Sequence, residues 1–257
     1  MSILVSNLSY VVDDSVLLQG ISVEAQQGSI VAVVGPNGSG KTSLLKVVNG
    51  ESIASGGSVL IDDEDVYALS LQTRAIRFGI LPQDAALDFP FRVVEVVQMG
   101  RIPHLTTMRV NQVVVDEVMA EMQLQDIRER IYLTLSGGEK QRVQIARVLS
   151  QIWDARERAC LFLDEPTAAL DLSHQLALFR TLKRITDIGT TVLVVLHDVN
   201  LALRFAKQVL LLSKGRLLAS GLPLDVLTRD NMREAFAVDI DMFATNDPTR
   251  PFILARE

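Results

Sequence analysis

The residues with the clearest chemical potential form a glycine-rich segment in the first fifth of the sequence. Residues 35–42 read Gly-Pro-Asn-Gly-Ser-Gly-Lys-Thr and satisfy the pattern G-x-x-x-x-G-K-[ST]. Glycines allow successive backbone N–H groups to turn inward around a phosphate, and the N-terminal end of a following helix adds positive charge. Lys41 would reach the β- and γ-phosphates of a nucleotide, and Thr42 would place its hydroxyl on Mg²⁺. A plain strand-to-helix connection would leave this complete pattern unexplained.

Two adjacent carboxylates follow a second apolar run. Asp164 and Glu165 come directly after residues 159–163, and Pro166 follows them. Ligands of open α/β sheets collect at the carboxyl ends of the strands, so we expect both carboxylates near the phosphate site. Asp164 would hold Mg²⁺ through its water shell, and Glu165 would accept a proton from the water that attacks the γ-phosphate. Without the phosphate loop, the same residues would read as a solvated turn.

A second glycine-containing segment precedes a long amphipathic helix. Residues 135–139 read Leu-Ser-Gly-Gly-Glu, and Ser136 can cap the helix that follows. Capping explains the serine, whereas Gly137 and Gly138 would also let a phosphate approach the backbone at the helix end. One nucleotide already has its phosphates held around Lys41. A second phosphate-binding element therefore indicates that two chains share each nucleotide.

Three apolar runs and two helical patterns must position these groups. The runs 30–34, 159–163 and 192–196 lack polar alternation, which is typical of parallel strands buried on both faces. Residues 3–34 otherwise alternate as strands do, while residues 117–122 and 139–153 show helical spacing. The pattern predicts an α/β fold. No buried-strand run occurs from 84 to 149, so we expect an inserted helical subdomain at 84–149.

Composition narrows the class of protein. The 257 residues suit one large domain, and 48% hydrophobic with 22% charged residues is typical of a globular chain. The net charge of −6 argues against nucleic acid as a partner. The longest apolar run has five residues, far fewer than a membrane-spanning helix needs, and no basic residue precedes Lys41 as in a signal peptide. The single cysteine, Cys160, fits a reducing compartment and an inert core position.

With these motifs in place, the chain resembles the ATP-binding subunit of ABC transporters over nearly its whole length. The signature motif of that family matches residues 135–139, and its D-loop matches residues 168–171, which end in Asp171. Its Q-loop matches Gln83, its switch histidine matches His197, and its adenine-stacking aromatic matches Tyr10 in spacing. The resemblance implies a P-loop ATPase core with an N-terminal antiparallel β subdomain and the inserted helical subdomain, together forming one domain over residues 1–257.

The resemblance also implies a complete site for ATP and Mg²⁺. Two subunits would pack head to tail, with ATP between the phosphate loop of one and the signature motif of the other. Glu165, His197 and Lys41 would be catalytic, and Thr42, Gln83 and Asp164 would serve the metal. The expected ATP-binding residues are Tyr10, Gly35, Pro36, Asn37, Gly38, Ser39, Gly40, Lys41, Thr42, Ser43, Gln83, Ser136, Gly137, Gly138 and Asp171.

Simpler interpretations compete at three of these positions. Tyr10 lies in an alternating strand and by default is a half-buried sheet residue, and Gln83 after a proline is by default a loop residue. His197 could be a hydrogen-bonded histidine at a strand end, although that end faces the expected phosphate site. We assign no role to His104 or His174, and residues 231–257 show no motif.

Three segments point to a subgroup of importers. Residues 89–91 (Phe-Pro-Phe), 98–101 (Gln-Met-Gly-Arg) and 151–158 are similar to ATPases that serve importers of chelated iron, heme and cobalamin, and among these to heme (hemin) import ATPases. The aromatic pair Phe89 and Phe91 would pack in the core or grip a membrane partner. Implied partners are a second copy, two transmembrane permease subunits and, indirectly, a periplasmic binding protein, at the cytoplasmic face of the inner membrane.

Three other functions are alternatives to heme import. The first is an ATPase that serves a ferric-siderophore or cobalamin importer. The second is a soluble ABC ATPase without a transport role, which would normally carry a second cassette or a long insertion. The third is a regulatory module that binds a nucleotide without hydrolysing it, which should lack the base that Glu165 provides.

Overall fold

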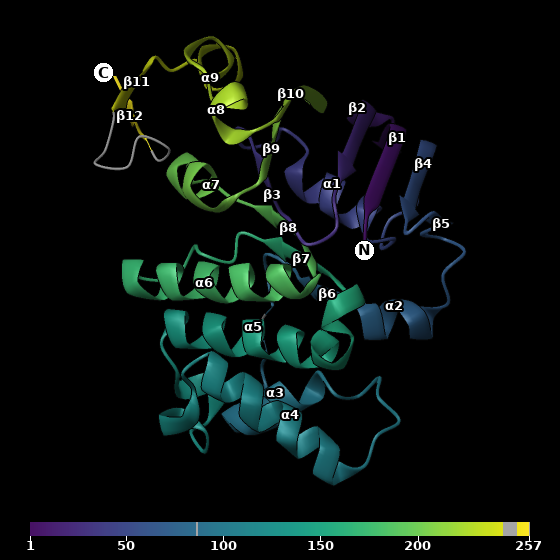
Figure 1. Ribbon diagram of the computed structural model, residues 1–257, viewed down its shortest axis with the longest axis vertical. Helices are drawn as coiled ribbons and strands as arrows, with labels where there is room; N and C mark the ends of the chain where they lie inside the picture. The colour runs from purple at the N-terminus through teal and green to yellow at the C-terminus, as the bar shows by residue number, and fades with distance from the viewer. Residues whose placement is uncertain (86, 244–250, 257) are drawn as a thin grey trace.

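The computed structural model describes residues 1–85, 87–243 and 251–256, arranged as mixed sheets with helices packed around them (Figure 1). The strands are β1 (Ile3–Val12), β2 (Ser15–Ala25), β3 (Ile30–Val34), β4 (Gly56–Ile61), β5 (Glu64–Asp65), β6 (Phe78–Leu81), β7 (Cys160–Asp164), β8 (Thr191–Val195), β9 (Gln208–Ser213), β10 (Arg216–Gly221), β11 (Ile240–Phe243) and β12 (Phe252–Ala255). The helices are α1 (Lys41–Val48), α2 (Leu71–Arg77), α3 (Val93–Met99), α4 (Met108–Glu121), α5 (Gly137–Ile152), α6 (Leu172–Ile188), α7 (Val199–Phe205), α8 (Pro223–Val226) and α9 (Arg229–Phe236).

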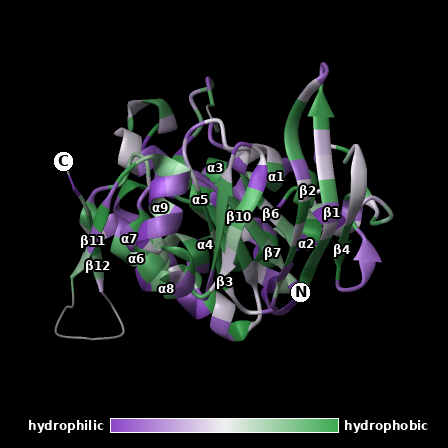
Figure 2. Ribbon diagram, turned by 90° about the horizontal axis from the view of Figure 1, so that it is seen from above, coloured by the Kyte–Doolittle hydropathy of each residue, from purple (hydrophilic) through white to green (hydrophobic). Residues whose placement is uncertain are grey.

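The central sheet has the strand order β10-β9-β3-β8-β7-β6. Strands β9, β3, β8, β7 and β6 run parallel, and only β10 is antiparallel to its neighbour. Every residue of β3, β7 and β8 is buried, as their unbroken apolar runs predict. Figure 2 shows this centre mainly in the hydrophobic colour. The carboxyl ends of the parallel strands therefore meet along one edge of a fully covered sheet.

Side-chain alternation divides the interior into two apolar cores, one on each face of this sheet. Val31 and Val33 of β3 face a core shared with α1 and the N-terminal sheet, whereas Ala32 and Val34 face a core shared with α3 to α7. The N-terminal sheet has the order β2-β1-β4-β5, and its strands pair antiparallel. The predicted fold class, a P-loop core with an antiparallel β subdomain and helical elements, is confirmed.

The helical part lies below α6 in Figure 1 and contains α3, α4 and α5. The expected helices at 117–122 and 139–153 are present as the end of α4 and nearly all of α5. Helix α5 packs against β6 as well as against α3 and α4, and its apolar side belongs to the same core as the central sheet. The boundaries of an inserted subdomain at 84–149 stay a prediction.

Helices α8 and α9 and strands β11 and β12 form the C-terminal part of the fold, which packs beside α7 (Figure 1). Helices α8 and α9 contact the outer strands β9 and β10, and the paired strands β11 and β12 follow them. Ile240 and Ile253 enter the core beneath this hairpin. Of the helices in the described ranges, none combines the length and the apolar character required to cross a membrane.

Candidate nucleotide site

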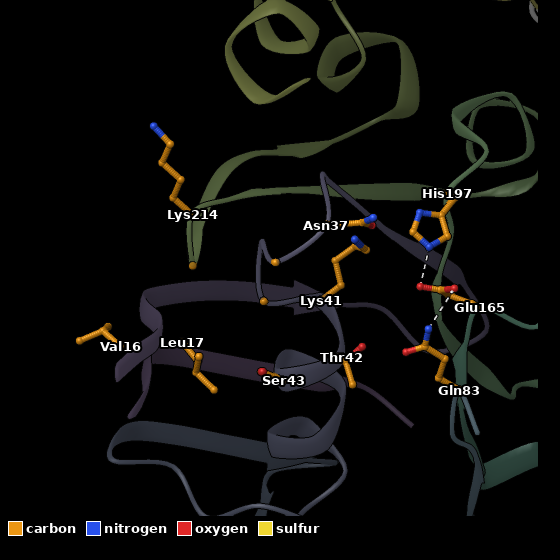
Figure 3. A pocket seen from close by; sticks show the side chains of 13 residues that line it. Val16, Leu17, Asn37, Lys41, Thr42, Ser43, Gln83, Glu165, His197 and Lys214 are labelled. Carbon is orange, nitrogen blue, oxygen red and sulfur yellow. Dashed lines mark hydrogen bonds and ion pairs between the residues drawn. The ribbon is translucent and has the colours of Figure 1, made fainter. Parts of the chain in front are cut away.

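A cavity of about 750 Å³ opens where the carboxyl ends of three parallel strands meet. The phosphate loop follows β3, Glu165 follows β7, and His197 follows β8. Figure 3 shows Lys41, Glu165, His197 and Gln83 gathered at one end of this space. The cavity is lined by Val16, Leu17, Asn37, Gly38, Gly40, Lys41, Thr42, Ser43, Gln83, Glu165, His197, Lys214 and Gly215.

The phosphate loop is shaped by close backbone approaches. Gly40 caps α1 with a φ of +98°, and a Cβ at this position would lie 2.8 Å from the carbonyl oxygen of Leu17. Only glycine fits such a place without strain. Lys41 bends back over the loop, where its Nζ donates to the carbonyl oxygens of Gly35 at 2.9 Å and Pro36 at 3.0 Å. The loop therefore encloses a cation at the start of a helix, the arrangement that binds phosphate.

Burial lowers the pKa of Lys41, and the nearby carboxylates Glu165 and Asp164 oppose this effect. The ammonium group is therefore partly desolvated and sits close to two negative charges. A bound phosphate would replace carbonyl oxygens with full negative charge around the same cation. In such a water-poor site, the attraction between the phosphate and the ammonium group would be stronger than in bulk solvent.

Glu165 is held at the cavity by two neighbours from different strands. Its backbone adopts a φ of +51°, an uncommon left-handed conformation for a residue other than glycine. The Oε1 atom lies 2.5 Å from Nε2 of His197, and Oε2 accepts a long hydrogen bond of 3.5 Å from Nε2 of Gln83. The structure thus brings together three side chains that the sequence singled out separately.

Asp164, Thr42 and Gln83 line a second, smaller cavity of about 240 Å³ beside the first. Asp164 is 3% exposed, and its Oδ1 has no hydrogen-bond partner within the described part of the chain. Burial raises the pKa of Asp164, while the hydroxyl of Thr42 works against that rise. Hydroxyl, amide and carboxylate oxygens are the hard ligands that Mg²⁺ prefers, and Mg²⁺ sites often combine one carboxylate with substrate phosphates. The residues present therefore fit the metal that the sequence predicts.

The second glycine-containing segment, residues 135–139, does not line this cavity. Ser136 Oγ accepts from the backbone N–H of Glu139 at 3.3 Å, and Glu139 Oε2 accepts from the N–H of Ser136 at 2.8 Å. This capping box, predicted in part from Ser136, starts the 16-residue helix α5 with Gly137 and Gly138 in its first turn. Asp171 caps α6 by accepting from the N–H of His174 at 2.9 Å. None of these residues lines the cavity of its own chain.

Tyr10 belongs to the N-terminal sheet. It pairs with Leu18 across β1 and β2 and packs against the core of the N-terminal sheet, and it does not line the cavity. Val16 and Leu17 line the cavity instead. The pairing of β1 with β2 shifts register on both sides of Tyr10, so simple alternation could not show which way the ring faces. Adenine stacking by Tyr10 stays a prediction without support from this geometry.

Sequence reasoning also missed Lys214 and Gly215. They form the two-residue turn between β9 and β10, with φ values of +49° and +75°. A residue pair ending in glycine between two apolar strands is a hairpin signal that could have located the turn. Gly215 donates to the carbonyl oxygen of Ser39 at 3.1 Å and accepts from the N–H of Gln19 at 2.8 Å. This turn therefore braces the phosphate loop against β2.

Two of the segments that indicate the importer subgroup contact each other. Arg101, with a side chain 2% exposed, donates to Asp154 Oδ2 at 2.5 Å and to the carbonyl oxygen of Ser150 at 2.7 Å. His104 Nε2 lies 2.7 Å from the carbonyl oxygen of Gln151. The connection between α3 and α4 is thereby fastened to the end of α5. These motifs build one polar junction around the buried side chain of Arg101.

Four other residues that the sequence analysis named, Phe89, Phe91, Cys160 and His174, do not line the cavity. Phe91 packs against the core, whereas Phe89 is 67% exposed and available to a partner. Cys160 is fully buried, as a core position predicts, and burial raises its pKa to about 12, which disfavours the reactive thiolate. His174 contacts Asp171 at 2.8 Å.

A parallel sheet with a phosphate loop and paired carboxylates at its carboxyl edge defines a nucleotide-hydrolysing α/β protein of the P-loop class. The family model described as "ABC transporter" matches residues 18–168. The chain belongs to the ABC transporter ATP-binding family, binds ATP and is an ATP hydrolase of that family. ABC ATPases of this kind work as dimers with membrane permease subunits.

Individual relatives cover almost the whole chain. The hemin import ATP-binding protein HmuV of Pseudomonas fluorescens is 41% identical over 240 residues, which are 93% of this chain and 94% of that protein. HmuV of Gloeobacter violaceus is 44% identical over 227 residues, covering 86% and 82% of the two chains. A solved metal-chelate type ABC transporter in an inward-facing conformation superposes on this chain with a TM-score of 0.83 at 25% identity. The superposition covers 100% of this chain and 97% of that chain.

Proposed function

We propose that this protein is the ATPase subunit of an ABC importer and that it couples ATP hydrolysis to the uptake of heme through a membrane permease. The observation that carries the substrate class is the similarity to hemin import ATP-binding proteins along more than nine-tenths of the chain. The likeness to a metal-chelate type transporter supports the same class of cargo. The ion pair between the buried Arg101 and Asp154 gives two of the sequence motifs of this subgroup a shared structural role.

Within the site, we assign each residue a role from its position. Residues 35–43 hold the triphosphate, and Lys41 neutralises its charge from inside the loop. Thr42, Gln83 and Asp164 would hold Mg²⁺, which supplies positive charge to the phosphates when bound. Glu165 accepts the proton of the attacking water, and His197 orients its carboxylate.

The other half of the site comes from a second copy. Ser136, Gly137, Gly138 and Asp171 lie at helix ends outside their own chain's cavity, so they can contact ATP only when they belong to a facing subunit. ATP then bridges two chains and favours their closure. We infer that the dimer docks on two permease subunits at the cytoplasmic face of the inner membrane, with the exposed Phe89 near the contact, and that a periplasmic binding protein delivers the cargo.

A growth assay tests the cargo. Deleting the gene should abolish growth on heme as sole iron source in a strain without a second heme importer, and a plasmid copy should restore it. A plasmid carrying Glu165→Gln should not restore growth, which ties import to hydrolysis. Unimpaired growth of the deletion strain on heme would refute the proposal, and a specific loss of siderophore or cobalamin uptake would identify the alternative cargo.

A further inference from the structure

The C-terminal hairpin is attached to the helix that follows His197. The side chain of Asn200, in the first turn of α7, donates from Nδ2 to the carbonyl oxygen of Ile253 at 3.0 Å. It also accepts on Oδ1 from the N–H of Ile253 at 2.8 Å. One amide side chain thus pairs with both backbone groups of one β12 residue, as a neighbouring strand would. Ile253 is 4% exposed, so this contact sits over the core.

Asn200 follows His197 by three positions in the sequence. Asp198 caps α7 by accepting from the N–H of Asn200 at 2.8 Å, and His197 precedes that cap. On the upstream side, the N–H of Leu196 donates to the carbonyl oxygen of Val33 at 3.0 Å, which fixes the end of β8. His197 itself is half exposed and lies at the end of a strand where the chain leaves the sheet. Its downstream anchor is therefore the first turn of α7.

Helix α7 is seven residues long and needs support from outside itself. Leu201, Ala202 and Leu203 face the core, and Phe205 stacks on Phe179 with the ring centroids 4.7 Å apart. These apolar contacts hold its middle and its end. At its beginning, besides the Asp198 cap, the pair of hydrogen bonds to Ile253 attaches α7 to the C-terminal hairpin.

The hairpin can act as an anchor because it is fixed in turn. Asp241 of β11 forms ion pairs with Arg229 of α9 at 2.8 Å and with Arg256 at 2.5 Å. Ile240 of β11 is 2% exposed and enters the same core as Ile253. In Figure 1 the hairpin and α9 lie together beside α7. The hairpin is thus held to α9 and to the core, and it can hold the first turn of α7 in turn.

We propose that Asn200 is a positioning residue for His197, through which the C-terminal hairpin controls the orientation of the Glu165 carboxylate. This inference rests on the roles proposed above for His197 and Glu165. An amide matches both backbone groups of Ile253, whereas a carboxylate cannot donate and would face a carbonyl oxygen. Asn200→Asp therefore keeps the side-chain shape while it breaks the attachment.

The test compares steady-state ATP hydrolysis by the full chain and its variants. Asn200→Ala and Asn200→Asp should each lower kcat by about threefold to thirtyfold, a range typical of mutations that act on a site without contacting its ligand. KM for ATP should change by less than about twofold, because the phosphate loop stays intact. Asn231→Ala is the matched control, since Asn231 also bonds a backbone carbonyl, that of Val226 at 2.8 Å, but does so within the C-terminal part. Its kcat should stay at the wild-type value.

A double mutant separates positioning from general destabilisation. If Asn200 acts through His197, adding Asn200→Ala to His197→Ala should cause no further loss of kcat. An equal loss in both backgrounds, or a wild-type kcat in both Asn200 variants, would overturn the proposal. Failure of the underlying function has a different signature, because His197→Ala and Glu165→Gln would then leave hydrolysis unchanged.

Discussion

Nε2 of His197 lies 2.5 Å from Oε1 of Glu165, across the carboxyl ends of the adjacent strands β8 and β7. Gln83 approaches the second carboxylate oxygen from β6, the next strand in the sheet. Groups that follow three neighbouring strands therefore meet at one carboxylate, which we propose as the general base. Because the left-handed backbone of Glu165 already directs the chain out of the sheet, its carboxylate projects into the cavity toward the place expected for the γ-phosphate.

Lys41→Ala should weaken ATP binding and abolish turnover. The substitution removes the cation that the loop encloses, together with its two hydrogen bonds to the carbonyl oxygens of Gly35 and Pro36. Binding of a fluorescent ATP analogue and release of inorganic phosphate measure the two effects. Lys183→Ala, on the exposed face of α6, should leave both unchanged. Near-normal hydrolysis by Lys41→Ala would show that another group neutralises the triphosphate.

Glu165→Gln should trap a dimer that depends on Mg-ATP. The amide keeps the shape of the side chain but cannot accept the proton, so hydrolysis should fall by at least the 10²–10⁴ typical of a general base. The variant should run as a dimer with Mg-ATP and mainly as a monomer without nucleotide. Size-exclusion chromatography with light scattering measures both states, and an oligomer that forms equally well without ATP would argue against the shared site.

Adding Gly138→Asp to Glu165→Gln should abolish that dimer. A carboxylate in the first turn of α5 would face the γ-phosphate held by the partner chain, and the two negative charges would repel. Gly138→Ala is the control, because its Cβ would lie 3.0 Å from the carbonyl oxygen of Ala169 and adds no charge. An undiminished dimer in the charged variant would place the signature motif outside the ATP interface.

Asp164→Asn should stabilise the nucleotide-free protein while it removes Mg²⁺-dependent hydrolysis. A buried carboxylate whose pKa is raised costs stability when ionised, and that cost is present at neutral pH. Thermal unfolding at neutral pH should show a higher Tm for the variant than for the wild-type protein. The gain should shrink as the pH falls through the raised pKa and vanish below the ordinary value of 3.8. A lower Tm for the variant at neutral pH would contradict this account.

Gly100→Ala should destabilise the fold by about 1–3 kcal/mol, the usual cost of overfilling a packed site. A Cβ on Gly100 would overlap the carbonyl oxygen of Arg147 and Oγ of Ser150, beside the Arg101 junction. Gly56→Ala is the matched control, because a Cβ there meets no atom within 4 Å. Urea unfolding of both variants measures the difference, and equal stabilities would show that α3 and α5 can separate without cost.

Local sequence determined the parts of the site that depend on neighbours in the chain. The phosphate loop, the Asp164–Glu165 pair and the Ser136 cap are each built from consecutive residues, and backbone geometry together with residue type dictates their shape. Unbroken apolar runs indicated β3, β7 and β8 because, among strands, five apolar residues in succession are typical of those covered on both faces. The α/β class and the position of the phosphate loop follow from these features alone.

Tertiary structure decided the contacts between distant segments, because alternation and spacing do not specify which elements become neighbours. Strand order placed His197 against Glu165, and an irregular register turned Tyr10 toward the N-terminal core and left Val16 at the cavity. The attachment of Asn200 to Ile253 joins residues 53 positions apart, through backbone groups that no sequence pattern marks. Such contacts form only after apolar burial has assembled the sheets, which is why residue types alone could name the chemical groups but could not place them.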